Sequence, residues 1–377
     1  MEKEHSKLFD IIIVLFLLLS PVIDLITGIE VNNNFIYTIG MIIRPIILLI
    51  IFMYLINLRR DRGIILLLLI YGLITTFSIF MIKFNSILDE ISIVTKIFYL
   101  PILILFFNRY KNRFINNKLL FIILIEYLLM IIIPYIINKD LFLFSSKLSI
   151  SYIILILFPL VYNYLLNKNY ILRYILIFLT VISTYILREN ILIIGLIIYV
   201  IYFYLKYILK EYKNSTNIKK TILIIIPIIF IICSIFLIPK LTMYHNVLEI
   251  IKKHNITGFN QNFINYVIFN GKLNVLDTLN AYYNITNIYG HLIGLTTNIT
   301  SHVIIGIDFF DIFYNIGIIG SITYVIVIIN GFIKSRTRGL SIIIFSLFIL
   351  YSIIIGNILI NPMVTIYLAV CMRCKNE

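Results

Sequence analysis

The sequence contains no tryptophan and only three cysteines among its 377 residues. Three cysteines are too few for the disulfide framework that holds small secreted proteins together. Cys371 and Cys374 form a single C-x-x-C with no second pair, which disfavours a zinc or redox role. Because tryptophan is absent, tyrosine has to supply any aromatic belt at a membrane boundary.

Charge is also scarce, and acidic residues are the rarer kind. The chain has 17 Asp and Glu against 31 Lys and Arg, while 61% of its residues are hydrophobic and its mean hydropathy is +1.05. These values exclude a water-soluble domain, and the apolar residues occur in runs of about 20, the length that crosses a bilayer as a helix. We therefore expect an all-α polytopic membrane protein, with residues 1–377 forming a single membrane domain.

Twelve apolar segments predict about twelve transmembrane helices. They lie at residues 9–28, 36–57, 63–82, 92–108, 118–137, 148–166, 170–187, 190–209, 220–239, 309–333, 340–356 and 358–372. The first segment has no small-residue cleavage site, so it predicts a retained helix and not a signal peptide. The last two are short, and Gly356-Asn357 and Asn361-Pro362 interrupt them, so a single broken helix is an alternative.

The distribution of positive charge predicts the orientation in the membrane. Every second loop is basic, and together with both termini this side holds 21 of the 31 Lys and Arg residues. The positive-inside rule then places both termini in the cytoplasm, with the protein in the cell (plasma or inner) membrane. The same rule accounts for the net charge of +14, so we expect no nucleic-acid partner.

One long segment, residues 240–307, is predicted to form a large extracytoplasmic loop. It contains His245, His254 and His291, and His302 lies near its end. Loops of this length in compact proteins are usually functional. Its frequent apolar residues argue against disorder and predict short helices that lie on the bilayer.

Arg44 lies inside the second apolar segment, about ten residues or roughly 15 Å from Asn34 at 1.5 Å per residue. A cation at that depth is costly unless it is paired or hydrated. One interpretation is an anion-binding group in a cavity open to the outside. The other is a structural ion pair with Asp24 or Glu126.

Asp308 and Asp311 are three residues apart at the start of an apolar run, so they share one helix face. Carboxylates at this place either face water, a partner or a substrate, or they mark the helix end at the headgroups.

Together these residues predict a site that faces outward. Its cations suit a pyrophosphate, and its carboxylates and histidine suit a sugar hydroxyl and its proton. We expect substrate-binding roles for Arg44, Arg188, Lys272 and Asp24, and catalytic roles for Asp308, Asp311 and His302. The chain has no metal-ligand spacing such as H-x-x-x-H, so the sequence gives no support for a metal site, and we expect no cofactor.

Several short stretches, spread over nearly the whole chain, carry a resemblance to a known family. They are S-P-V-I-D-L-I-T-G at Ser20–Gly28, I-G-M-I-I-R at Ile39–Arg44, F-N-G-K at Phe269–Lys272, H-L-I-G-L at His291–Leu295, D-F-F-D-I-F-Y-N-I-G-I-I-G at Asp308–Gly320 and G-N-I-L-I-N-P at Gly356–Pro362. Their order and spacing resemble the O-antigen ligase and O-antigen polymerase superfamily of bacterial membrane glycosyltransferases, in particular its ligase-like branch. Two positions depart from the family pattern. N-G-K replaces its S-G-R, and Gly306 stands where relatives have an acidic residue or a histidine.

The resemblance implies a GT-C-like fold and a metal-independent, inverting transfer of glycan from a polyprenyl pyrophosphate carrier to an acceptor hydroxyl. Such a protein would act as polymerase or ligase in surface polysaccharide synthesis of the O-antigen or capsule type. Its partners would be the lipid-linked oligosaccharide, membrane lipid and other polysaccharide-assembly proteins. A flippase or other transporter of lipid-linked oligosaccharide is the alternative, although the long loop and the aspartate pair favour the enzyme. A non-catalytic scaffold would explain neither Arg44 nor the loop.

The predicted topology can be checked by cysteine labelling in intact cells. In a variant without native cysteines, a cysteine at position 255 should react with a membrane-impermeant maleimide, because residues 240–307 are expected outside. A cysteine at position 214 should react only after the membrane is opened. Labelling of position 214 but not 255 in intact cells would reverse the orientation.

Overall fold

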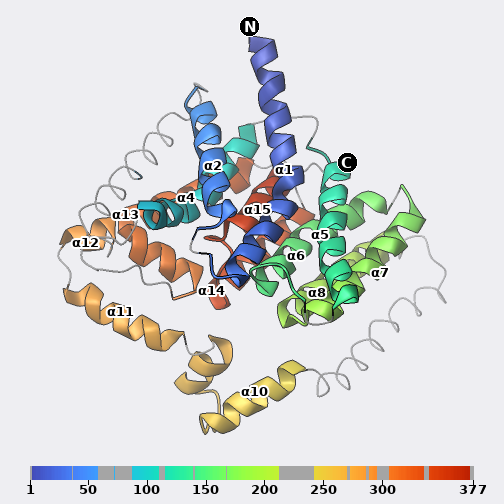
Figure 1. Ribbon diagram of the computed structural model, residues 1–377. Helices are drawn as coiled ribbons and strands as arrows, with labels where there is room; N and C mark the ends of the chain where they lie inside the picture. The colour runs from blue at the N-terminus through green and yellow to red at the C-terminus, as the bar shows by residue number, and fades with distance from the viewer. Residues whose placement is uncertain are drawn as a thin grey trace. The chain divides into compact units, whose positions relative to one another are not determined.

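The computed structural model describes residues 2–35, 37–57, 72, 87–109, 115–138, 141–166, 168–211, 242–269, 272–285, 288–294, 305–334 and 339–373. All regular secondary structure within these ranges is helical, so the predicted all-α class is confirmed (Figure 1).

Within the described ranges, seven helices are long and apolar enough to cross a membrane. They are α1 (Glu2–Asn32), α2 (Ile39–Asn57), α5 (Asn117–Ile137), α6 (Lys147–Leu165), α7 (Tyr170–Leu187), α8 (Asn190–Glu211) and α13 (Asp308–Lys334). Shorter apolar helices occur in α4 (Ile87–Arg109), α14 (Leu340–Ile354) and α15 (Pro362–Arg373). This set of helices supports a polytopic membrane protein.

Ten of the twelve predicted apolar segments coincide with these helices. The other two, 63–82 and 220–239, lie outside the described residues apart from residue 72, so the number twelve stays a prediction. The last two segments form separate helices, because α14 ends at Ile354 and α15 begins at Pro362.

The chain divides into two compact units, Met1–Glu189 with Leu279–Glu377, and Asn190–Thr278. The second unit contains α8, α10 (Thr242–Lys253) and the π-helix η3 (Phe263–Ile268). The predicted loop 240–307 therefore contributes to both units, since α12 (Ile288–Ile293) and the end of α11 (Leu273–Ile285) belong to the first. The short helices expected in this segment are present.

Burial in the first unit separates central helices from peripheral ones. In α6, 78% of the membrane segment is buried, against 22% in α2. Helix α15 packs against α4 and α6 among the helices of this unit (Figure 1). On α2, the exposed side chains Ile42, Ile46, Leu49 and Met53 follow the spacing of one helix face, which suits contact with lipid.

Side chains next to the helix starts satisfy backbone groups that the helices leave without partners. Asn116 accepts from the N–H of Leu119 at 3.0 Å, and Ser146 accepts from that of Ser149 at 3.3 Å. Such caps stabilise a helix by about 0.5–2 kcal/mol in proteins, and here they define where α5 and α6 begin.

Helix α13 is interrupted at Gly317, where φ is 66° and ψ is −172°. This backbone conformation is essentially restricted to glycine. The end of α12 packs directly on the interruption, because a Cβ at Gly317 would lie 2.5 Å from the carbonyl oxygen of Leu292. Two independent constraints thus require glycine at this position.

Gly317→Ala should therefore destabilise the protein, by about 1–3 kcal/mol from the backbone conformation alone. Thermal unfolding in detergent, followed by size-exclusion chromatography, should show a lower transition temperature. Gly258→Ala is the matched control, because no atom lies within 4 Å of a Cβ at that position. Equal transition temperatures for the two variants would contradict this account of the interruption.

Candidate functional site

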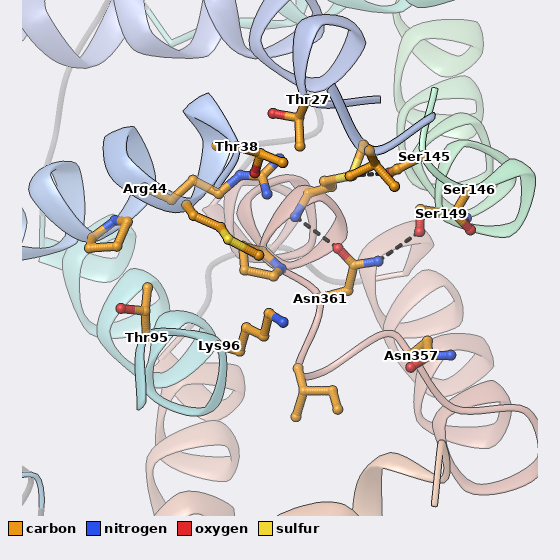
Figure 2. A pocket seen from close by; sticks show the side chains of 17 residues that line it. Thr27, Thr38, Arg44, Thr95, Lys96, Ser145, Ser146, Ser149, Asn357 and Asn361 are labelled. Carbon is orange, nitrogen blue, oxygen red and sulfur yellow. Dashed lines mark hydrogen bonds between the residues drawn. The ribbon is translucent and has the colours of Figure 1, made fainter. Parts of the chain in front are cut away.

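A polar cavity of about 330 Å³ lies in the first unit (Figure 2). Its lining comes from the end of α1, the start of α2, α4, the start of α6, and the α14–α15 loop with the start of α15. The lining residues are Thr27, Val31, Thr38, Gly40, Met41, Arg44, Pro45, Thr95, Lys96, Ser145, Ser146, Ser149, Asn357, Ile360, Asn361, Pro362 and Met363. We call this space the polar cavity.

The lining of the polar cavity combines hydroxyls, amides and two cations. Arg44 and Lys96 carry the positive charge, and no acidic side chain is among the lining residues in the described part of the chain. In Figure 2 the ammonium of Lys96 points towards Asn361, and the guanidinium of Arg44 lies beside Thr38. A lining with two cations and several neutral donors suits an anionic ligand with further hydroxyl or carbonyl groups.

Arg44 is held by an ion pair with Asp24, which also accepts a hydrogen bond from the hydroxyl of Tyr127 at 2.5 Å. The hydroxyl of Tyr127 lies 3.3 Å from that of Tyr367, which in turn lies 2.6 Å from Ser20 Oγ. This network joins α1, α2, α5 and α15. Since Asp24 is 2% exposed, the network fixes the guanidinium from the protein side.

The α14–α15 loop, residues 355–361, carries amides into the cavity wall. Asn361 donates to Ser149 Oγ at 2.7 Å and accepts from the N–H of Met363 at 3.0 Å, as the dashed lines in Figure 2 show. Asn357 has a positive φ of 59°, a conformation that asparagine tolerates better than most residues. These contacts give the loop a defined shape where it meets α6.

Thr27 lines the cavity, but its hydroxyl oxygen is itself buried and makes no hydrogen bond to any described residue. An unsatisfied buried hydroxyl costs about 1–3 kcal/mol. Gly40 lets α2 approach this hydroxyl, because a Cβ there would lie 2.6 Å from Thr27 Oγ1.

All cavity segments come from helix ends or loops that the charge pattern predicts on the outer side. The predicted outer loop 30–34 connects α1 and α2. The predicted outer loop 83–90 leads into α4, and the predicted outer loop 138–147 leads into α6. The loop between the last two predicted helices is also outer. The structure thus brings together segments for which the positive-inside rule predicts the same side.

Two of the predicted site residues, Asp24 and Arg44, lie together, and both interpretations of Arg44 describe part of its environment. Arg44 is paired with Asp24, as the interpretation of a structural ion pair expected. It also lines the polar cavity, as the interpretation of an anion-binding group required. Since α2 begins at Ile39, Arg44 is about 8 Å from the helix start.

Asp308 and Asp311 do not line the polar cavity. Asp308 is fully buried and accepts from the backbone N–H groups of Ile358 and Leu359, at 2.8 and 2.9 Å. Asp311 is 2% exposed and accepts from the N–H groups of Ile305 and Gly306. They share a helix face as predicted, and that face points towards backbone segments of the protein.

Arg188 ends α7 with a left-handed φ of 55° and is exposed, with its guanidinium 5.9 Å from the ring centre of Tyr185. It does not line the polar cavity. Burial raises the pKa of the neighbouring Glu189, and the ammonium of Lys147 partly offsets this effect. Lys272 belongs to the second unit, and His302 lies outside the described residues.

Sequence reasoning did not select Lys96, Asn357 or Asn361 for the site. Lys96 had a usable signal, because a lysine inside an apolar helix is costly unless it faces water or a partner. The two asparagines were visible in the interruption between the last two apolar segments and in the stretch G-N-I-L-I-N-P, but neither had been given a role in the site.

Comparison of the chain with protein-family models, curated proteins and solved structures finds no match.

Asp24→Asn should destabilise the protein, because it leaves the Arg44 guanidinium without a counter-charge among apolar helices. Breaking one side of a buried pair costs about 3–5 kcal/mol, and the access of Arg44 to the cavity should reduce this loss. The double variant Asp24→Asn/Arg44→Gln has no unpaired charge and should lose less than the single variant. Thermal unfolding in detergent measures both, and equal losses would show that the charge pair is not the cause.

Proposed function

We propose that this chain is a membrane glycosyltransferase that uses a glycan on a polyprenyl pyrophosphate carrier, as polymerase or ligase in surface polysaccharide synthesis. The observation that carries the proposal is the polar cavity, in which Arg44 and Lys96 face a space without acidic side chains in the described lining. The resemblance of the short motifs supplies the reaction type.

The two cations suit the developing charge of a pyrophosphate leaving group. In the transfer, the acceptor oxygen forms a bond to the anomeric carbon while the bond from that carbon to the pyrophosphate oxygen breaks. The electron pair of that bond leaves with the pyrophosphate, so fixed positive charge beside it lowers the barrier. Arg44 is fixed by Asp24, which limits the rearrangement needed when the charge develops.

The hydroxyls and amides of the cavity suit the sugar part of the donor. Asn361 lines the cavity and is fixed by Ser149 and Met363. Direct displacement at the anomeric carbon inverts its configuration. The acceptor proton requires a base within hydrogen-bond reach. His302 stays the predicted base, since Asp308 is fully buried against backbone N–H groups and does not line the polar cavity.

Loss of positive charge in the cavity should abolish transfer while the protein remains inserted. Arg44→Ala and Lys96→Ala should each lower the rate by about 10²–10³, the effect of removing one electrostatic donor to a developing charge. Arg44→Lys should retain part of the activity if charge alone matters, and little if the two-pronged geometry of guanidinium is needed. The measurement is glycan chain length on gels from cells whose own gene is deleted.

Two controls separate function from folding. Lys118→Ala removes an exposed cation outside the cavity and should leave the glycan unchanged. Asp24→Asn/Arg44→Gln keeps a neutral pair in place of the ion pair and should be inserted but inactive. Normal glycan in Lys96→Ala and in this double variant would remove the cavity from the reaction. Repeat units retained at the cytoplasmic face in the deletion strain would identify a flippase instead.

A further inference from the structure

We propose that Asp308 and Asp311 are positioning residues that brace the α14–α15 loop against the start of α13 and so shape the wall of the polar cavity. The bracing follows from the geometry alone. Its effect on a pyrophosphate ligand rests on the proposed function.

Asp308 holds the loop through a single carboxylate oxygen. Its Oδ2 accepts from two successive backbone N–H groups, those of Ile358 and Leu359, at 2.8 and 2.9 Å. The side chain is fully buried. Both peptide groups lie in the stretch 356–361, which is not helical.

Asp311 holds the segment on the other side of the contact. Its two oxygens accept from the N–H groups of Ile305 and Gly306, at 2.6 and 2.9 Å. These residues directly precede α13, so Asp311 folds the entry of the helix back onto its first turn. Because the two aspartates are spaced i, i+3, they lie on one helix face and accept hydrogen bonds from two different backbone segments.

The two braced segments touch each other through backbone atoms. A Cβ at Gly356 would lie 1.9 Å from the carbonyl oxygen of Gly306, and φ at Gly356 is +75°. Only glycine allows this approach at position 356. Asp308, Asp311 and this contact therefore lock residues 305–306 and 356–359 into one arrangement.

The carbonyl groups of the same loop are held as well. Tyr152 donates to the carbonyl oxygen of Gly356 at 3.4 Å, and Tyr324 donates to that of Leu359 at 3.3 Å. On either side of the braced peptide groups, Asn357, Ile360 and Asn361 line the polar cavity. A shift of the loop would move these residues together.

Hydrogen–deuterium exchange on the purified full chain in detergent tests the brace directly. Asp308→Ala should increase exchange of the Ile358 and Leu359 amides by about 10- to 100-fold, because both lose their hydrogen-bond acceptor. Asp308→Asn keeps an acceptor oxygen and should change exchange much less. Asp277→Ala, which removes an exposed carboxylate, is the control and should leave the loop unchanged.

Binding and transfer separate bracing from catalysis. Farnesyl pyrophosphate serves as a short polyprenyl pyrophosphate probe in equilibrium dialysis, and Asp308→Ala should weaken its binding while Asp308→Asn retains it. Asp308→Asn should also keep glycan transfer within about tenfold of the unmodified protein, whereas loss of a general base costs about 10²–10⁴.

The outcomes are distinct. Unchanged exchange in Asp308→Ala would overturn the brace. A loss of transfer of 10²-fold or more in Asp308→Asn, with exchange and binding intact, would make Asp308 the base and would also overturn it. If Asp308→Ala does not insert, Asp308→Asn decides the question. Its weaker acceptor should raise exchange slightly above that of the unmodified protein, and only at the Ile358 and Leu359 amides. Failure of the unmodified protein to bind the probe would count against the proposed function, while the exchange data would still decide the brace.

Discussion

The first unit depends on one constraint, which is that backbone polar groups among apolar helices must find partners within the protein. An unbroken helix meets this requirement by itself, but the interruption between α14 and α15 does not. Here the carboxylate of Asp308 satisfies two N–H groups of the loop, and Asn361 satisfies the N–H of Met363 at the start of α15. Because these partners exist, irregular backbone can lie beside the polar cavity and present amide side chains to it.

A second constraint concerns charge. A guanidinium inside an apolar helix needs a counter-charge, and Asp24 supplies it from α1. Asp24 is in turn held by Tyr127, so the negative charge stays behind Arg44 and does not face the cavity. The same residue that makes Arg44 tolerable therefore leaves the donors of the guanidinium available on the cavity side, and the cavity retains a positive lining together with Lys96.

Close backbone contacts place the helices that carry these groups. Gly317 meets the end of α12, Gly356 meets Gly306, and Gly28 meets the backbone of Phe144. At each position a Cβ would lie within 2.5 Å of a backbone atom. Small residues of this kind let membrane helices and loops approach where no water is available to fill a gap. They bring the end of α1 next to the segment that leads into α6, and both line the polar cavity.

The sequence by itself determined the helical class, ten of the helix positions and the interruption before α15, and it left an ion pair of Arg44 with an acidic side chain as one of two interpretations. These features follow from local composition, because a run of about 20 apolar residues or an arginine within one has the same consequence in any membrane fold. Only the tertiary structure decided that Asp24 and not Glu126 pairs with Arg44, that Lys96 shares its cavity, and that Asp308 and Asp311 bind backbone amides. Those outcomes depend on which helix faces meet, and helix periodicity shows that two residues share a face without showing what that face contacts.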